Sequence, residues 1–69
     1  MDKDVNITTE YIKLDQLLKF AGAVAIGSEA KQLILEGKVS VNGQPCLVRG
    51  KKLHSGDVVT VNGAEITIH

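Results

Sequence analysis

Aromatic residues are nearly absent from this 69-residue chain, which has one tyrosine, one phenylalanine and no tryptophan. Proteins that hold single-stranded RNA on an open surface stack successive bases on several aromatic side chains. Tyr11 and Phe20 alone cannot form such a row of rings. The sequence therefore argues against a platform for single-stranded RNA.

Cysteine is limited to Cys46, and no apolar run approaches the length needed to span a bilayer, about 20 residues. A lone cysteine cannot form an internal disulfide, which indicates a reducing compartment, so we expect a cytoplasmic protein without a membrane partner. Free cysteines are often buried, and we predict that Cys46 is a small packing residue.

Recognisable catalytic patterns are also missing. The chain has no His-Glu-x-x-His, Gly-x-Ser-x-Gly, phosphate-binding loop or dinucleotide glycine pattern. His54 and His69 do not have the spacing of metal ligands. We therefore predict no catalytic residues, no metal and no cofactor, and conclude that the protein is not an enzyme.

Charge is balanced overall but unevenly distributed. The formal net charge is zero, yet residues 11–52 carry seven cations against three carboxylates, a net +4, whereas residues 1–10 and 53–69 each carry −2. A local basic patch matters more than net charge for binding a polyanion. An unevenly charged, merely solvated surface is the alternative reading of the same numbers.

The periodicity of apolar residues predicts two short helices. The first covers residues 14–21, with Gly22 as its stop. The second begins at Ser28, whose hydroxyl we expect to cap the free amides of the first turn, and ends at Gly37.

From residue 38 the period changes to two, which predicts strands. Strands are expected at 39–41, 58–61 and 65–68, with hairpin turns at Asn42-Gly43 and Asn62-Gly63. Residues 1–10 are expected to be a lead-in, in which the alternation of residues 5–8 can add an edge strand. Residues 11–69 are expected to form a single α+β domain, with two short helices packed on a small antiparallel sheet.

Four short motifs occur in a fixed order between residues 12 and 61: Lys13-Leu14-Asp15, Ala30-Lys31 followed by Leu33-Ile34, Gly37 to Gly43 (Gly-Lys-Val-Ser-Val-Asn-Gly), and Gly56-Asp57-Val58. In this order they resemble the RNA-binding domain named after small-subunit ribosomal protein S-four, also called the alpha-L motif. The basic segment of residues 49–53 looks most like the small stand-alone bacterial members. Many members carry Ser-Arg where this chain has Ile26-Gly27, so Lys31 has to compensate for the missing arginine.

The resemblance implies RNA binding through the helix pair and the basic loop that follows. The implied partner is structured RNA, ribosomal or transfer RNA, bound by a ribosome-associated monomer. The candidate RNA-binding residues are Lys13, Ser28, Lys31, Lys38, Asn42, Arg49, Lys51 and Lys52.

Each candidate has a simpler structural interpretation beside the functional one. Asn42 is foremost a turn former, Ser28 a helix cap and Lys13 an ordinary solvated residue, whereas the cations of residues 49–52 have no evident structural need. For the whole chain, the alternative is a protein–protein interaction domain associated with the ribosome, which would expose a large apolar patch.

Overall fold

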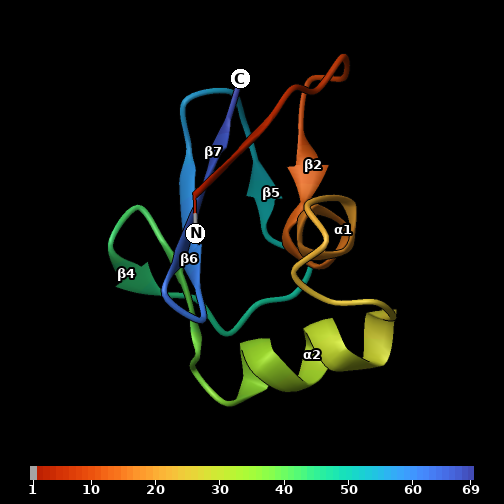
Figure 1. The fold of residues 1–69 in the computed structure, drawn as a ribbon, viewed down its shortest axis with the longest axis vertical. Coiled ribbons are helices and arrows are strands. Elements are labelled where there is room, and N and C mark those ends of the chain that lie inside the picture. Colours follow the sequence, from red (N-terminus) through yellow and green to blue (C-terminus); the bar gives the residue numbers. More distant parts are fainter. Residues whose placement is uncertain (1) are drawn as a thin grey trace.

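The computed structural model describes residues 2–69 as a small α+β domain (Figure 1). Its elements, in chain order, are β1 (Lys3–Val5), β2 (Ile12–Lys13), α1 (Leu14–Phe20), α2 (Gly27–Leu35), β3 (Val39–Val41), β4 (Gln44–Pro45), β5 (Lys52–Leu53), β6 (Val58–Val61) and β7 (Ala64–Ile68). Five strands form one sheet in the order β1-β7-β6-β3-β4, and β2 pairs with β5 in a separate two-stranded ribbon. In Figure 1, α1 is seen end-on and α2 side-on, so the two helices cross.

The core lies between the helices and one face of the larger sheet. Alternate residues of β3, β6 and β7 are buried because their side chains point to the same face, as the period of two requires. α1 buries Leu14, Leu17 and Leu18 against this face, and α2 buries Ala30 and Ile34. Cys46 packs partly against the same core. The predicted packing of two helices on a small sheet is confirmed.

The sheet is antiparallel as predicted except at one edge, where a parallel strand makes it mixed. β3–β4 and β6–β7 are antiparallel hairpins, and β3 also pairs antiparallel with β6. β1 runs parallel to β7, with Val5 opposite Ile68. Parallel neighbours need a long connection, and here nearly the whole chain lies between β1 and β7. The edge strand also forms at Lys3–Val5, before most of the alternating segment that suggested it.

The second helix begins differently from the prediction. Its N-cap is Ile26, Ser28 lies inside the first turn, and no side chain caps the helix. The carboxylate of Glu29 instead reaches back and accepts a hydrogen bond from the Ala25 N–H (3.2 Å). A carboxylate in the first turn is stabilised there by the free amides and the helix dipole. The stop at Gly37, with φ of 74°, agrees with the prediction.

Both Asn-Gly turns adopt the conformation that their sequence favours. Asn42 and Asn62 have φ of 51° and 50°, and the glycine after each is also at positive φ. Two consecutive positive values belong to the type I′ turn, whose twist matches that of a hairpin. The two turns therefore share one backbone geometry.

Only the first turn is tied to another part of the fold. The Val58 N–H donates to Oδ1 of Asn42 (2.9 Å), and the Asn42 side-chain amide donates to Oδ1 of Asp57 (3.2 Å). Oδ2 of Asp57 accepts from the backbone N–H of His54 (2.8 Å). This Asn42–Asp57 network joins the β3–β4 turn to the turn that precedes β6.

We predict that Asn42→Gly lowers the free energy of unfolding by about 1–2 kcal/mol more than Asn62→Gly does. Both changes keep a residue that favours positive φ, so their backbone terms are matched. Of these two asparagines, Asn42 alone makes side-chain hydrogen bonds within residues 2–69. Urea denaturation followed by circular dichroism measures the difference, and equal losses for the two variants would show that the network adds no stability.

Asp57 makes stability depend on pH. The hydrogen bond from the His54 backbone N–H, followed by that from the Asn42 amide, holds the pKa of the Asp57 carboxyl below its ordinary value of 3.8. Because the pKa is lower in the folded state, the stabilisation is present above the unfolded-state pKa and is lost as the pH falls through the folded-state pKa. The affected window lies below about pH 5.

Asp57→Asn is expected to cost about 1 kcal/mol at pH 7, because its amide nitrogen would face a donor on one side. The difference from the parent should shrink between pH 5 and pH 2, as the parent carboxyl is protonated. Glu65→Gln is the matched control, since the exposed Glu65 side chain makes no hydrogen bond among residues 2–69. Denaturation curves at pH 7 and pH 2.5 test this, and a pH-independent difference would contradict it.

Candidate nucleic-acid interface

The start of α1 is closed by backbone carbonyls of a distant loop, residues 46–51, which we call the basic loop. The N–H of Leu14 donates to the carbonyl of Lys51 (2.9 Å), and the N–H of Asp15 donates to the carbonyl of Arg49 (3.1 Å). The Gln16 N–H donates to Oδ1 of Asp15 (2.8 Å). Since Lys13 provides no side-chain cap, the loop satisfies amides that a helix start otherwise leaves to solvent.

The basic loop leads directly into β5, which pairs antiparallel with β2. Ile12 is opposite Leu53, and Lys13 is opposite Lys52. Leu53 is buried and Ile12 is half-buried, so Lys13 and Lys52 project together from the outer side of the ribbon. Like charges directly opposite each other destabilise a strand pair. Because the register places these two lysines opposite each other, it concentrates positive charge beside the start of α1 despite this repulsion.

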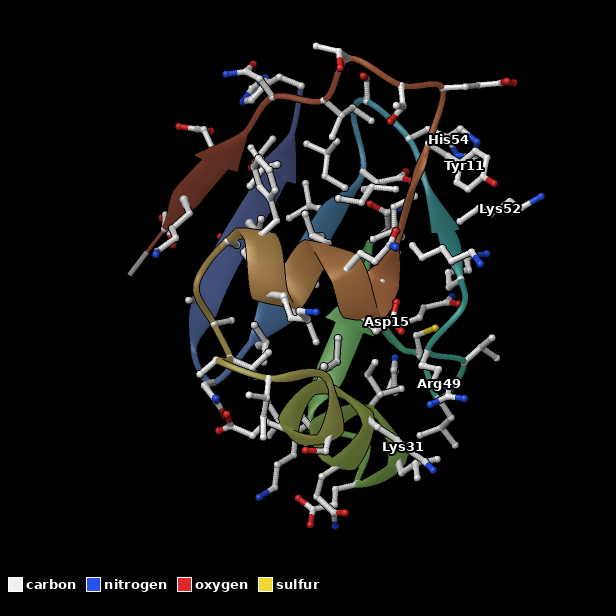
Figure 2. The ribbon with its side chains drawn as sticks, turned by 90° about the vertical axis from the view of Figure 1, so that its right-hand side faces the viewer. Tyr11, Asp15, Lys31, Arg49, Lys52 and His54 are labelled. Carbon is white, nitrogen blue, oxygen red and sulfur yellow. The ribbon has the colours of Figure 1, made fainter. Side chains whose placement is uncertain are left out.

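Five of the predicted cations form what we call the basic face: Lys13, Lys31, Arg49, Lys51 and Lys52. All five are exposed, and none has a carboxylate within 4.0 Å in the described part of the chain. Figure 2 shows Lys31 of α2, Arg49 of the basic loop and Lys52 of β5 along one edge of the molecule, with Asp15 near them. The N-terminal end of the α1 dipole also faces this surface, although its first amides are bonded to the basic loop and to Asp15.

Of the other three predicted residues, Lys38 and Asn42 are engaged within the fold, and Ser28 is exposed beside Glu29. The ammonium of Lys38 lies 3.2 Å from a carboxylate oxygen of Glu36. The side-chain amide of Asn42 is used in the network with Val58 and Asp57. Ser28 is exposed, but the carboxylate of Glu29 next to it already occupies the approach to the helix start. A role for these three in RNA binding stays a prediction.

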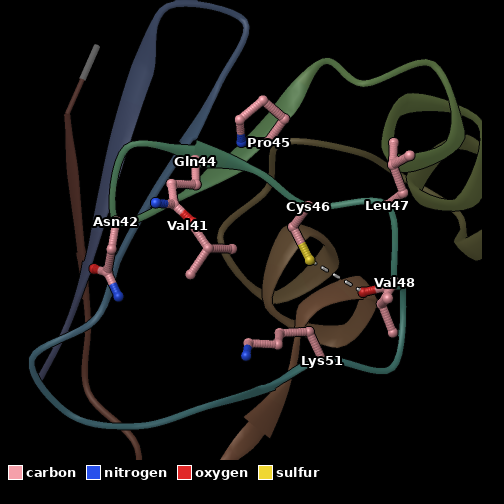
Figure 3. Close-up of a pocket in the computed structure, with 8 residues that line it drawn as sticks. All are labelled: Val41, Asn42, Gln44, Pro45, Cys46, Leu47, Val48 and Lys51. Carbon is pink, nitrogen blue, oxygen red and sulfur yellow. Dashed lines mark hydrogen bonds between the residues drawn. The ribbon is translucent and has the colours of Figure 1, made fainter.

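An open pocket of about 550 Å³ lies between the β3–β4 turn and the basic loop (Figure 3). Cys46 crosses its floor, where its thiol donates to the Val48 carbonyl at 3.6 Å, and Lys51 lies on its rim. Lys51 also contributes, as the smallest of several causes, to lowering the pKa of Asp57. Its ammonium therefore acts on a nearby carboxylate, and Lys13, Lys31, Arg49 and Lys52 are the remaining cations of the basic face.

Sequence reasoning missed two residues on the outer side of the ribbon, Tyr11 and His54. Their ring centroids are 6.4 Å apart, and the ammonium of Lys52 lies 4.9 Å from the centre of the Tyr11 ring. In Figure 2 both rings lie next to Lys52, on the same edge of the molecule as Arg49 and Lys31. Because 43 positions separate these residues in the sequence, no local pattern places them together; only the β2–β5 register does.

This surface has the chemistry of a polyanion-binding face. It offers exposed cations beside two rings, and no group of three or more metal-ligating side chains occurs in residues 2–69. Neither helix among those residues is long or apolar enough to cross a bilayer. Phosphate groups suit such a surface because lysine and arginine side chains contact phosphate oxygens directly.

Comparisons with known proteins agree with this geometry. The sequence pattern of the S4 domain matches residues 5–69. A protein of Bacillus subtilis (strain 168), described as a probable ribosome maturation protein, RlbA, is 43% identical over 63 residues, which cover 91% of this chain and 89% of that protein. The match takes in both helices, the basic loop and the β2–β5 ribbon, and the chain belongs to the S4 domain family.

Proposed function

We propose that this protein is a non-catalytic RNA-binding protein that recognises structured ribosomal RNA in the cytoplasm through the basic face. The observation that carries the proposal is a group of four cations, none of which has a carboxylate within 4.0 Å among the described residues. Lys31, Arg49 and Lys52 lie along one edge in Figure 2, and Lys13 is opposite Lys52 in the ribbon. Isolated surface cations are common, but four that share one edge carry more positive charge than the nearby Asp15 balances, so they oppose folding slightly. Such a cluster is accounted for by an anionic partner.

Folded RNA suits this surface better than an extended single strand. The cations come from a helix, a loop and a ribbon, so they do not lie along one line. Such an arrangement suits the phosphates of a folded RNA, whose relative positions are fixed. The chain has too few aromatic residues to stack a run of bases. The S4 domain family is typically RNA-binding, and the Bacillus subtilis relative is described as a probable ribosome maturation protein. Both support ribosomal RNA as the partner.

Affinity for deproteinised bacterial ribosomal RNA should fall steeply with salt. If the basic face neutralises four or five phosphates, the slope of log K against log salt concentration is expected to be about −3 to −4.5. A fluorescence-anisotropy titration at several salt concentrations measures it, with poly(U) as the single-stranded control. No binding at low salt, or equal affinity for poly(U), would overturn the proposal.

The triple variant Arg49→Ala, Lys51→Ala and Lys52→Ala is expected to weaken RNA binding at least tenfold and to reduce the steepness of the salt slope by about 2 to 3. The fold should persist, because the loop closes α1 through backbone carbonyls that these substitutions keep. Thermal denaturation checks that point.

Lys19→Ala is the control for Arg49→Ala made alone, which is one of the three changes in the triple variant. Lys19 is exposed in the last turn of α1, roughly 9 Å along the helix axis from Lys13. The Lys19→Ala substitution removes one positive charge that lies outside the basic face, so we expect binding within twofold of the parent. If Lys19→Ala weakens binding as much as Arg49→Ala does, net charge governs binding and the basic face has no special role.

A second candidate function rests on exposed apolar side chains in the same loop. Leu47 is 58% exposed and Val48 is 62% exposed, directly before Arg49. These residues favour contact with a protein partner on a ribosomal particle. Binding to a ribosomal particle, but not to its deproteinised RNA, would support this candidate over the first one.

A further inference from the structure

The outer side of the β2–β5 ribbon carries four side chains of two chemical kinds. The register places Lys13 opposite Lys52, and extending it by one position places Tyr11 opposite His54. The inward-facing residues between them, Ile12 and Leu53, pack into the core. Two rings and two cations thus share one solvent-facing surface, which we call the ribbon face.

Neither ring is used to build the core. Tyr11 is 37% exposed and His54 is exposed, and the contacts of the Tyr11 ring are with His54 and the Lys52 ammonium. The ring planes are inclined at 55°, so the two rings form a shallow corner and do not cover each other. A flat aromatic group entering this corner would gain contact with both rings.

We propose that the ribbon face binds one unpaired nucleotide of the RNA, with its base stacked on Tyr11 beside His54 and its flanking phosphates on Lys13 and Lys52. This inference rests on the proposed RNA-binding function and names the kind of RNA feature that the face selects. A bulged or looped-out nucleotide offers an exposed base face next to two phosphates. An acidic peptide would use the two cations but would leave both rings without a partner.

Lys52 does not block this site. Its ammonium lies over the ring at 4.9 Å, but the exposed side chain is flexible and its cation–π contact is weak in water. Base stacking on an aromatic ring is the stronger interaction, so the base displaces the ammonium. The same ammonium is then free to contact a phosphate. The ribbon face holds one base only, because Tyr11 and His54 are the two rings that it carries.

The test uses two RNA hairpins, one with a single bulged 2-aminopurine and one fully paired. At low salt, Tyr11→Leu is expected to bind the bulged hairpin about tenfold more weakly than the parent and the paired hairpin within twofold. Quenching of the 2-aminopurine by the parent should be lost in Tyr11→Leu and kept in Tyr11→Phe. Phe20→Leu is the matched control, because Phe20 is another exposed aromatic residue, 68% exposed, outside the ribbon face.

A measurement on the unmodified protein does not depend on how the variants fold. Tyr11 is the one tyrosine of the chain, so its ring protons are identified in an NMR spectrum by residue type. They should shift upfield on adding the bulged hairpin and move little with the paired one.

The outcomes separate this site from the proposed function. Equal effects of Tyr11→Leu on both hairpins, or no shift of the Tyr11 ring, overturn the nucleotide site while the basic face stands. If the parent binds neither hairpin, the proposed function fails, and the nucleotide site fails with it.

Discussion

The closure of α1 by carbonyls of the basic loop is the contact on which the arrangement of this surface depends. A seven-residue helix has little stability of its own, and its first amides need acceptors. The carbonyls of Lys51 and Arg49 supply two of them. Because these acceptors belong to the backbone, the side chains of the same residues remain free and are held beside the helix start. One set of hydrogen bonds therefore both orders the helix and positions the cations.

The charge arrangement opposes folding locally and is supported elsewhere. Lys13 and Lys52 face each other across a ribbon of two residue pairs, next to the positive end of a helix. Buried Leu53, packed in the core with α1, holds that ribbon in place. The Asn42–Asp57 network fixes the chain where it leaves β5 for β6. Apolar packing and a polar clamp on either side of the ribbon thus maintain a cluster of like charges that would otherwise spread apart.

The two Asn-Gly turns show how far a local pattern reaches. Both adopt the expected turn, because asparagine and glycine tolerate positive φ whatever surrounds them. The same pattern predicts nothing about the side chain of Asn42, which hydrogen-bonds to Asp57 and Val58 and so links its turn to the turn before β6. Ser28 illustrates the opposite error: serine often caps helices, but the N-cap of α2 is Ile26, two residues earlier, and Glu29 makes the local contact instead.

The sequence by itself determined the helices, the hairpin strands and their turns, because these follow from periodicity and turn chemistry within a few residues. Its motifs indicated the family, and its charges marked all five cations of the basic face as candidates. The tertiary structure decided the parallel edge strand β1, the separate β2–β5 ribbon and the meeting of Tyr11 with His54. It also distinguished Lys38, paired with Glu36, from the free cations. These features depend on contacts between residues as much as 63 positions apart, and the relative placement of such residues is set by packing of the whole core.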